Sequence, residues 1–358
     1  MNRVAHERLR NQRIERSELR RGVDVVRWLV ASQAQDYAAA KWALGLRTTG
    51  LTDPDVEREL DSGAIVRTHV MRPTWHFVSR EDVRWLVALT APRVNAVNAH
   101  RYRQLELDAA TLRKANAVFA RELEGGRHLI RDELREALAR ARIGTEDQRM
   151  AHILMHAELD ALVCSGPRRG KRFTYALLEE RAPQARVLSR EDALAELAGR
   201  YFAGRGPATV RDFAKWSGLA AADARRGLEA VAGTLERAVL GGVVHWSGAP
   251  ARSVRHRPPR AHLLSIYDEY LSSYRDRGAL CDPAFAKRLA GMGAALGYVV
   301  VLDGRIAGTF RRTVARQSVR IEVTLFRRID AAEREAVAAA GSRFARFLGE
   351  GYSADLTL

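Results

Sequence analysis

The tetrapeptide Ser-Arg-Glu-Asp occurs at 79–82 and again at 189–192, and each copy follows a ribbon-like stretch of β-forming residues. Each copy predicts the start of a helix, because its serine can cap the first turn while the aspartate three residues later reaches back to it. The chain therefore repeats one order of elements: helices, a two-stranded ribbon, then a new helix. This order is typical of a winged helix, and its recurrence predicts tandem units.

Hydrophobic periodicity places the elements of three such units. The first is expected to have helices over 23–30, 37–46 and 54–61 and strands over 65–71 and 74–78. The second is expected to have helices over 111–123, 130–141 and 150–157 and strands over 161–164 and 172–177. The third is expected to have helices over 194–201, 210–214 and 221–231, a turn at 216–219, and wing strands over 235–240 and 243–246. Its helix–turn–helix pattern makes it the clearest of the three.

The composition changes after about residue 250. An extended connector around Pro258-Pro259 carries the basic residues Arg252, Arg255, His256, Arg257 and Arg260. Beyond it, Asp303-Gly304 is a strong hairpin signal between strands over 297–302 and 305–310, followed by a strand over 319–326 and a closing helix over 331–348.

The expected fold class is α+β and mainly helical, with three tandem winged-helix units and a C-terminal β-rich subdomain. The expected domain boundaries are 1–105, with an N-terminal helix and a glutamine-containing loop; 106–190, with a basic hairpin; 191–250; and 251–358, with the basic connector.

The charge of the chain favours a polyanionic partner. Its 358 residues include 59 Lys and Arg against 43 Asp and Glu, which gives a net charge of +16. Such a field attracts nucleic acid because basic contacts to phosphates release counterions, although an arginine-rich proteome would give a similar composition. No apolar run is long enough for a membrane span or a secretory signal. We therefore expect a cytoplasmic, nucleoid-associated protein without a membrane partner.

Two glutamines, Gln33 and Gln35, lie at the junction between the first two predicted helices. If the junction is extended, residues i and i+2 project to the same side, whereas on a helix they would lie about 200° apart. Glutamines at helix ends often bind only backbone groups, so a structural role and a role in a site both stay open. Asp36 is the alternative functional residue at this junction, as a general base.

Several other residues are candidates for binding. On the first ribbon, Arg72, Thr74, Trp75 and His76 form a cationic and aromatic cluster that could contact a substrate or pack the ribbon onto its helices. At the tip of the second ribbon stand Arg168, Arg169, Lys171 and Arg172, which would contact phosphates or form a solvated loop.

The sequence offers little support for a metal or a cofactor. His152 and His156 have the spacing of metal ligands but lack a third ligand, and the isolated Cys164 and Cys281 are expected to be buried apolar residues. No P-loop, dinucleotide-binding glycine pattern or Gly-x-Ser-x-Gly motif occurs, so we expect neither a cofactor nor a metal.

Taken together, these segments resemble the AlkZ-like family of winged-helix DNA glycosylases over nearly the whole chain. The resemblance is carried by the basic ribbon and by four segments: VVRWLVASQAQDYAAAKWALGLRT, IVRTHVMRPTWHFVSREDVRWL, YFAGRGPATVRDFAKWSGL and YDEYLSSYRDR. The family's catalytic motif is glutamine, an aliphatic residue, then glutamine or aspartate. It matches here as Gln33-Ala34-Gln35, with a middle residue smaller than the family's usual one, which implies the glutamine branch. That branch is similar to proteins that protect antibiotic producers from their own alkylating products.

The resemblance implies a monofunctional glycosylase that acts on bulky N7-alkylated purines in double-stranded DNA and unhooks interstrand crosslinks. In this interpretation Gln35 positions a water molecule and Gln33 contacts that water or the sugar, with Arg72, Thr74, Trp75 and His76 in support. We expect a monomer with a shallow site and little or no base flipping. A non-catalytic winged-helix regulator explains the charge equally well but gives the glutamines no role, and an RNA-binding accessory protein is a further alternative.

Overall fold

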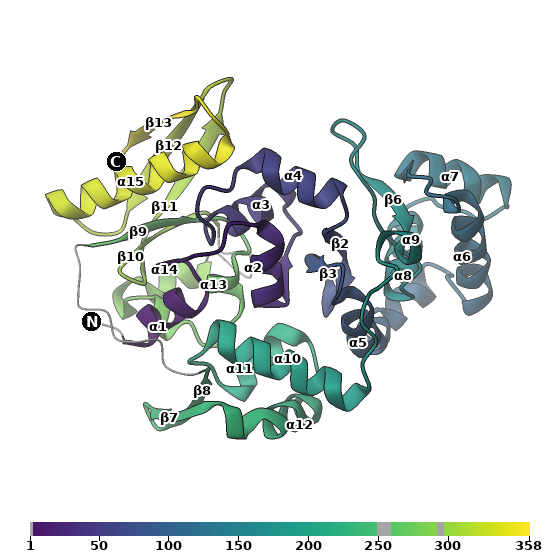
Figure 1. Cartoon of the computed structure of the whole chain (residues 1–358), viewed down its shortest axis with the longest axis horizontal. Helices are drawn as coiled ribbons and strands as arrows, with labels where there is room; N and C mark the ends of the chain where they lie inside the picture. The colour runs from purple at the N-terminus through teal and green to yellow at the C-terminus, as the bar shows by residue number, and fades with distance from the viewer. Residues whose placement is uncertain (1–2, 249–258, 292–296) are drawn as a thin grey trace.

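The computed structural model describes residues 3–248, 259–291 and 297–358 and has a mixed α+β architecture (Figure 1). The N-terminal part comprises α1 (Arg3–Asn11), α2 (Gly22–Leu29), β1 (Ala31–Gln33), α3 (Tyr37–Gly45), α4 (Asp53–Asp61), β2 (Ile65–Val70), β3 (Arg72–Ser79) and α5 (Val83–Gln104). Its strands form a sheet in the order β1-β3-β2, with antiparallel pairing throughout. The helices and the ribbon expected here are confirmed.

The second part lies on the right of Figure 1 and has its own hydrophobic core, which extends from Tyr102 to Val163. Its elements are α6 (Ala109–Leu123), β4 (Leu129–Ile130), α7 (Arg131–Arg140), α8 (Arg149–Leu159), β5 (Val163–Ser165), β6 (Thr174–Leu177) and α9 (Leu178–Arg181). The hairpin between β5 and β6 projects toward α4 (Figure 1).

The third part comprises α10 (Arg190–Arg205), α11 (Val210–Ser217), α12 (Ala221–Val231), η1 (Ala232–Thr234), β7 (Glu236–Leu240) and β8 (Val243–Ser247). Gly218 ends α11 in the left-handed conformation, with φ of 72°. A Cβ at this position would lie 2.4 Å from the carbonyl oxygen of Met71, so glycine also permits the close approach of the β2–β3 turn. The helix–turn–helix order and the paired ribbon are as expected, while the winged-helix classification stays a prediction.

The C-terminal part is built on a sheet in the order β13-β12-β11-β10-β9. Its elements are β9 (Ala261–Leu264), α13 (Glu269–Ser272), η2 (Gly278–Leu280), η3 (Pro283–Phe285), α14 (Ala286–Gly291), β10 (Val299–Leu302), β11 (Arg305–Val314), β12 (Ser318–Leu325), α15 (Ala331–Leu348) and β13 (Ser353–Thr357). The Asp303-Gly304 turn and the closing helix are confirmed, whereas β9 and β13 were not expected. Residues 252–258 of the basic connector lie outside the described residues.

One hydrophobic core joins the N-terminal, third and C-terminal parts and also takes in Leu159, Cys164, Leu178 and Ala182 of the second part. Trp42 of α3 contributes to it by packing against Phe344 of α15, with ring centroids 4.9 Å apart, while its indole N–H donates to Leu263 of β9. The expected boundaries between these parts therefore cross a shared core. No helix within the described residues is long and apolar enough to span a bilayer.

The two Ser-Arg-Glu-Asp copies behave differently. Ser189 caps α10 as expected, accepting a hydrogen bond from the Asp192 backbone N–H at 3.1 Å. At the first copy the helix starts only at Val83, and Ser79 is the last residue of β3. There, the Asp82 carboxylate still reaches back to the Ser79 hydroxyl, from which it accepts a hydrogen bond at 2.9 Å, and it also accepts from Arg186, Arg200 and the Trp85 indole. The expected helix start at Ser79 was therefore wrong: β3 continues through Ser79, and Asp82 is the residue that precedes the helix.

Candidate active site

The glutamine junction is a short edge strand. Gln33 pairs with His76 of β3, and the Ala34 N–H donates to the Trp75 carbonyl at 2.7 Å, so the backbone stays extended through Ala34. Ala34 is buried, whereas Gln33 is half-buried and Gln35 is exposed. This alternation is expected when the side chains before and after Ala34 leave the opposite face of the strand. The extended geometry required for a paired glutamine site is therefore present.

Both glutamine amides retain hydrogen-bonding capacity. The Gln35 Oε1 accepts one long bond, 3.4 Å, from the Trp75 backbone N–H. Gln33 is held through its backbone N–H, which donates to Glu269 Oε1 at 2.9 Å, and no hydrogen bond within the described residues engages its side-chain amide. An amide has one acceptor oxygen and two donor hydrogens, so each of the two side chains has groups left to bind water or substrate.

Asp36 has a structural contact. It is the N-cap of α3, and its Oδ1 accepts a hydrogen bond from the Ala39 N–H at 2.9 Å. A carboxylate at this position is stabilised by the unpaired N–H groups of the first turn. This contact turns one of its oxygens toward α3 and explains why an aspartate follows the glutamine pair.

His76 is fully buried behind the strand pair. Burial and the nearby Arg72 guanidinium lower its pKa to about 3, so the ring is neutral near pH 7. Its Nδ1 donates to the Thr74 carbonyl at 2.9 Å, which leaves Nε2 as an acceptor 3.5 Å from an Arg72 nitrogen. The ring thus orients Arg72. Thr74 Oγ1 is buried without a hydrogen-bond partner.

Trp75 packs in a cationic and aromatic stack. Its ring lies 4.5 Å from that of His69 and is covered by the Arg67 guanidinium at 4.2 Å, while its indole N–H points to Glu158 at 3.4 Å. Arg67 also donates from Nε to the Ala34 carbonyl at 3.0 Å and stacks on Phe173. These contacts favour the packing interpretation of the cluster.

The basic hairpin packs against acidic neighbours. Arg168 binds Glu57 at 3.2 Å, Arg169 binds Glu133 at 2.6 Å, and Arg172 binds Asp132 at 3.1 Å. Lys171 is exposed and has no carboxylate within ion-pair distance among the described residues. The pairs of Arg169 and Arg172 are exposed and therefore weak, so both side chains can exchange a carboxylate for a phosphate.

Sequence reasoning gave no role to three residues that contact the glutamine strand: Arg67, Arg205 and Glu269. All three lie inside the segments that carry the family resemblance. One feature of the sequence could have pointed to them: each is a charged residue within a largely apolar segment. Such a residue is usually buried only when a partner compensates its charge.

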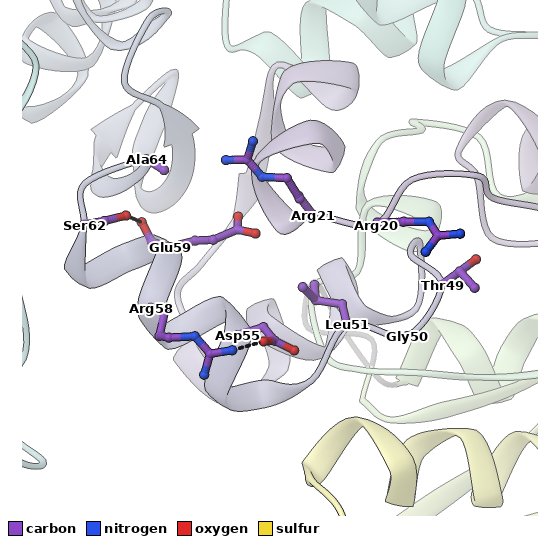
Figure 2. A pocket seen from close by; sticks show the side chains of 10 residues that line it. All are labelled: Arg20, Arg21, Thr49, Gly50, Leu51, Asp55, Arg58, Glu59, Ser62 and Ala64. Atoms are coloured by element: carbon purple, nitrogen blue, oxygen red, sulfur yellow. Dashed lines mark hydrogen bonds and ion pairs between the residues drawn. The ribbon is translucent and has the colours of Figure 1, made fainter.

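A hollow lies elsewhere on the N-terminal part. It has a volume of about 540 Å³ and is lined by the residues drawn in Figure 2: Arg20, Arg21, Thr49, Gly50, Leu51, Asp55, Arg58, Glu59, Ser62 and Ala64. Asp55 pairs with Arg58, and Glu59 accepts from the backbone N–H groups of Gly22 and Val23 at 3.0 and 2.6 Å. Both carboxylates therefore already have partners within the protein. Neither Gln33 nor Gln35 lines the hollow.

The two histidines of α8 each contact a residue at an end of their own helix. His152 binds the Gln148 carbonyl at 3.0 Å and His156 lies 3.1 Å from Asp160. Within the described residues, no group of three or more His, Cys, Asp or Glu side chains could hold a metal ion. Cys164 and Cys281 are both buried and unpaired.

Three comparisons relate this chain to known proteins. The family model described as "DNA glycosylase AlkZ-like" matches residues 26–347. An interstrand DNA cross-link repair glycosylase of Streptomyces sahachiroi is 25% identical over 203 residues, which is 55% of this chain and 54% of that protein, so the match spans about half the length of the relative. The solved structure of the S. sahachiroi DNA glycosylase AlkZ superposes with a TM-score of 0.81, covering 99% of both chains at 21% identity. The family model covers most of the sequence and the fold agrees over its whole length, so the chain belongs to the AlkZ-like DNA glycosylase family.

Proposed function

We propose that this protein is a monofunctional DNA glycosylase that hydrolyses the N-glycosidic bond of bulky N7-alkylated purines in duplex DNA. The observation that carries the proposal is a pair of glutamine amides with free hydrogen-bonding capacity, one on the last residue of β1 and the other two residues beyond it. Membership of the family supports the same activity.

The proposed chemistry suits amides. Alkylation at N7 leaves the purine cationic, so the base departs readily and needs no strong general acid. The enzyme must place water against the anomeric carbon and tolerate an oxocarbenium-like transition state. Gln35 is proposed to position the water and Gln33 to contact the water or the sugar, although neither amide can take a proton as a carboxylate would.

The exposure of Gln35 favours bulky substrates. A site that opens directly at the protein surface can accept an adduct that would not fit a closed pocket, so we expect little or no base flipping. The named activity of the S. sahachiroi relative supports the unhooking of interstrand crosslinks as a further substrate class. A role in antibiotic self-resistance follows from the glutamine branch of the family. The net positive charge of the chain attracts duplex DNA electrostatically.

The test is base release from a defined duplex. The protein is incubated with DNA carrying one N7-alkylguanine, and alkali then converts abasic sites into strand breaks. We expect breaks at the adduct, and a second duplex with an N7-linked interstrand crosslink is expected to separate into single strands on denaturation. Tight binding without strand breaks would instead support a non-catalytic DNA-binding regulator.

A further inference from the structure

The glutamine strand is an edge strand whose outer side faces a buried ion pair. In the sheet order β1-β3-β2, β1 has a strand neighbour on one side only. On its other side, the Ala31 carbonyl accepts from Arg205 Nη2 at 3.0 Å, and the Gln33 N–H donates to Glu269 Oε1 at 2.9 Å. The two charged side chains therefore occupy the hydrogen-bonding positions that a further strand would fill.

Arg205 also stabilises the bend that leads into β1. Val30 has φ of 66° and ψ of −53°, a conformation that is strained for a β-branched residue. Arg205 donates to the carbonyls on both sides of this residue, at 2.8 Å to Leu29 and 3.0 Å to Ala31. Strain of this kind persists only when the surroundings over-determine the backbone. One guanidinium thus fixes both the bend and the start of the strand.

The pair is itself rigidly held. Arg205 and Glu269 are both completely buried, and Arg205 Nη2 lies 2.8 Å from Glu269 Oε2. The same carboxylate oxygen accepts from the Trp216 indole at 2.8 Å and from Ser273 Oγ at 2.9 Å. Burial opposes the charge of Glu269, but Arg205 and the Gln33 N–H outweigh burial and lower the pKa to about 2. The carboxylate therefore stays ionised at neutral pH.

From these contacts we propose that Glu269 and Arg205 are positioning residues, which fix the direction of Gln33 and Gln35 by completing the hydrogen bonds of β1. This inference rests on the proposed function. Neither residue needs to touch the substrate. A buried pair contributes little net stability because of its desolvation cost, so geometry at the strand is the stronger reason for its presence.

The test compares two neighbouring buried pairs. Glu269→Asp keeps a carboxylate near Arg205 but shortens its reach to the Gln33 N–H, and Glu269→Gln removes the charge. The matched control is Asp268→Asn, because Asp268 forms an equally buried pair with Arg47, 2.8 Å apart, and within the described residues neither side chain of this pair makes a hydrogen bond to β1. For each folded variant, single-turnover base release, duplex affinity and Tm are measured on the full chain.

We expect both Glu269 variants to lose about tenfold or more in single-turnover rate, since small displacements of a positioned group cost large factors in rate. Their duplex affinity should change by less than about twofold, and Asp268→Asn should release base at the wild-type rate despite a lower Tm. The Gln33 amide proton, observed by NMR, should shift in the Glu269 variants and not in the control.

Two outcomes would overturn the assignment: a folded Glu269→Asp protein with the wild-type rate and an altered Gln33 amide signal, or an equal loss of rate in Asp268→Asn. If the Glu269→Gln variant does not fold, the single-turnover rate of Glu269→Asp alone tests the assignment. Failure of the proposed function is distinguished by the wild-type protein, which would then release no base at all.

Discussion

Ala34 separates the two glutamines, and its side chain, N–H and carbonyl all make contacts within the protein. Its methyl group is buried, its N–H donates to Trp75, and its carbonyl accepts from Arg67. A small residue here lets the strand lie close to the core while both neighbours face outward. Both backbone groups of the middle residue are therefore hydrogen-bonded, which fixes the position of the motif.

At the residue scale, Gln35→Ala should reduce release of N7-alkylguanine by tenfold or more, on the order of 1.4 kcal/mol or above, because it removes the group that orients the water. Duplex affinity should stay unchanged, since the side chain is uncharged. The measurement is single-turnover release with a parallel binding assay. Full activity in both Gln33→Ala and Gln35→Ala would refute the proposed roles.

The alternative base is tested by Asp36→Asn. Asparagine caps helices as well as aspartate does, so this change removes the carboxylate while preserving the start of α3. We expect release within about threefold of wild type, because Gln35 and not Asp36 is proposed to position the water. A much larger loss at unchanged Tm would assign the general base to Asp36.

At the element scale, the loop of the β5–β6 hairpin is anchored to the N-terminal part at Arg168 and carries further positive charges beyond it. Arg168 is half-buried and lies over the rings of Tyr37 and Phe173, at 5.1 Å from each. This stack joins the hairpin to the start of α3, directly after the glutamine pair. We therefore expect DNA bound at the hairpin to lie near the start of α3 as well.

Lys171 is the hairpin residue best suited to a phosphate, because it is exposed and its ammonium has no carboxylate partner among the described residues. Lys171→Ala should weaken duplex binding and reduce the log–log salt slope by about one unit. Lys114→Ala, at an exposed position of α6, serves as the control. Equal salt slopes for the two variants would contradict a phosphate contact at the tip.

At the scale of the whole molecule, buried histidines make folding sensitive to acid. Burial lowers the pKa of both His76 and His262 to about 3, whereas an unfolded histidine titrates near 6.5. Between these values the unfolded chain binds more protons, so stability rises with pH and falls on acidification. The pKa of Glu269 is lowered from its ordinary value of 4.5 to about 2, so its contribution to folding stability is lost only as the pH falls below about 4.5.

We therefore expect the free energy of unfolding to fall as the pH drops from about 6.5 toward 3, by up to about 1.4 kcal/mol per pH unit for each buried histidine. Urea unfolding at a series of pH values measures this slope. His262→Gln should flatten it, because one of the titrating groups is removed. A slope unchanged in that variant would show that His262 does not titrate on unfolding.

Much of the fold was predictable from local signals. Periodicity located the main helices, Gly218 and Asp303-Gly304 marked turns, and the glutamine pair was found at its junction because the flanking helices were clear. Strands β9 and β13 were missed because both lie in the C-terminal sheet beside partners distant in sequence, and short strands carry little periodicity of their own.

The sequence by itself determined which segments become helices and where two neighbouring glutamines interrupt them, since periodicity, caps and turns act over a few residues. Only the tertiary structure decided which way the glutamines face. The Gln33 N–H is held by a carboxylate 236 residues away, and an arginine from α10 holds the preceding turn. Hydrogen bonds on the outer side of an edge strand depend on what the fold brings there, and no local pattern encodes that partner.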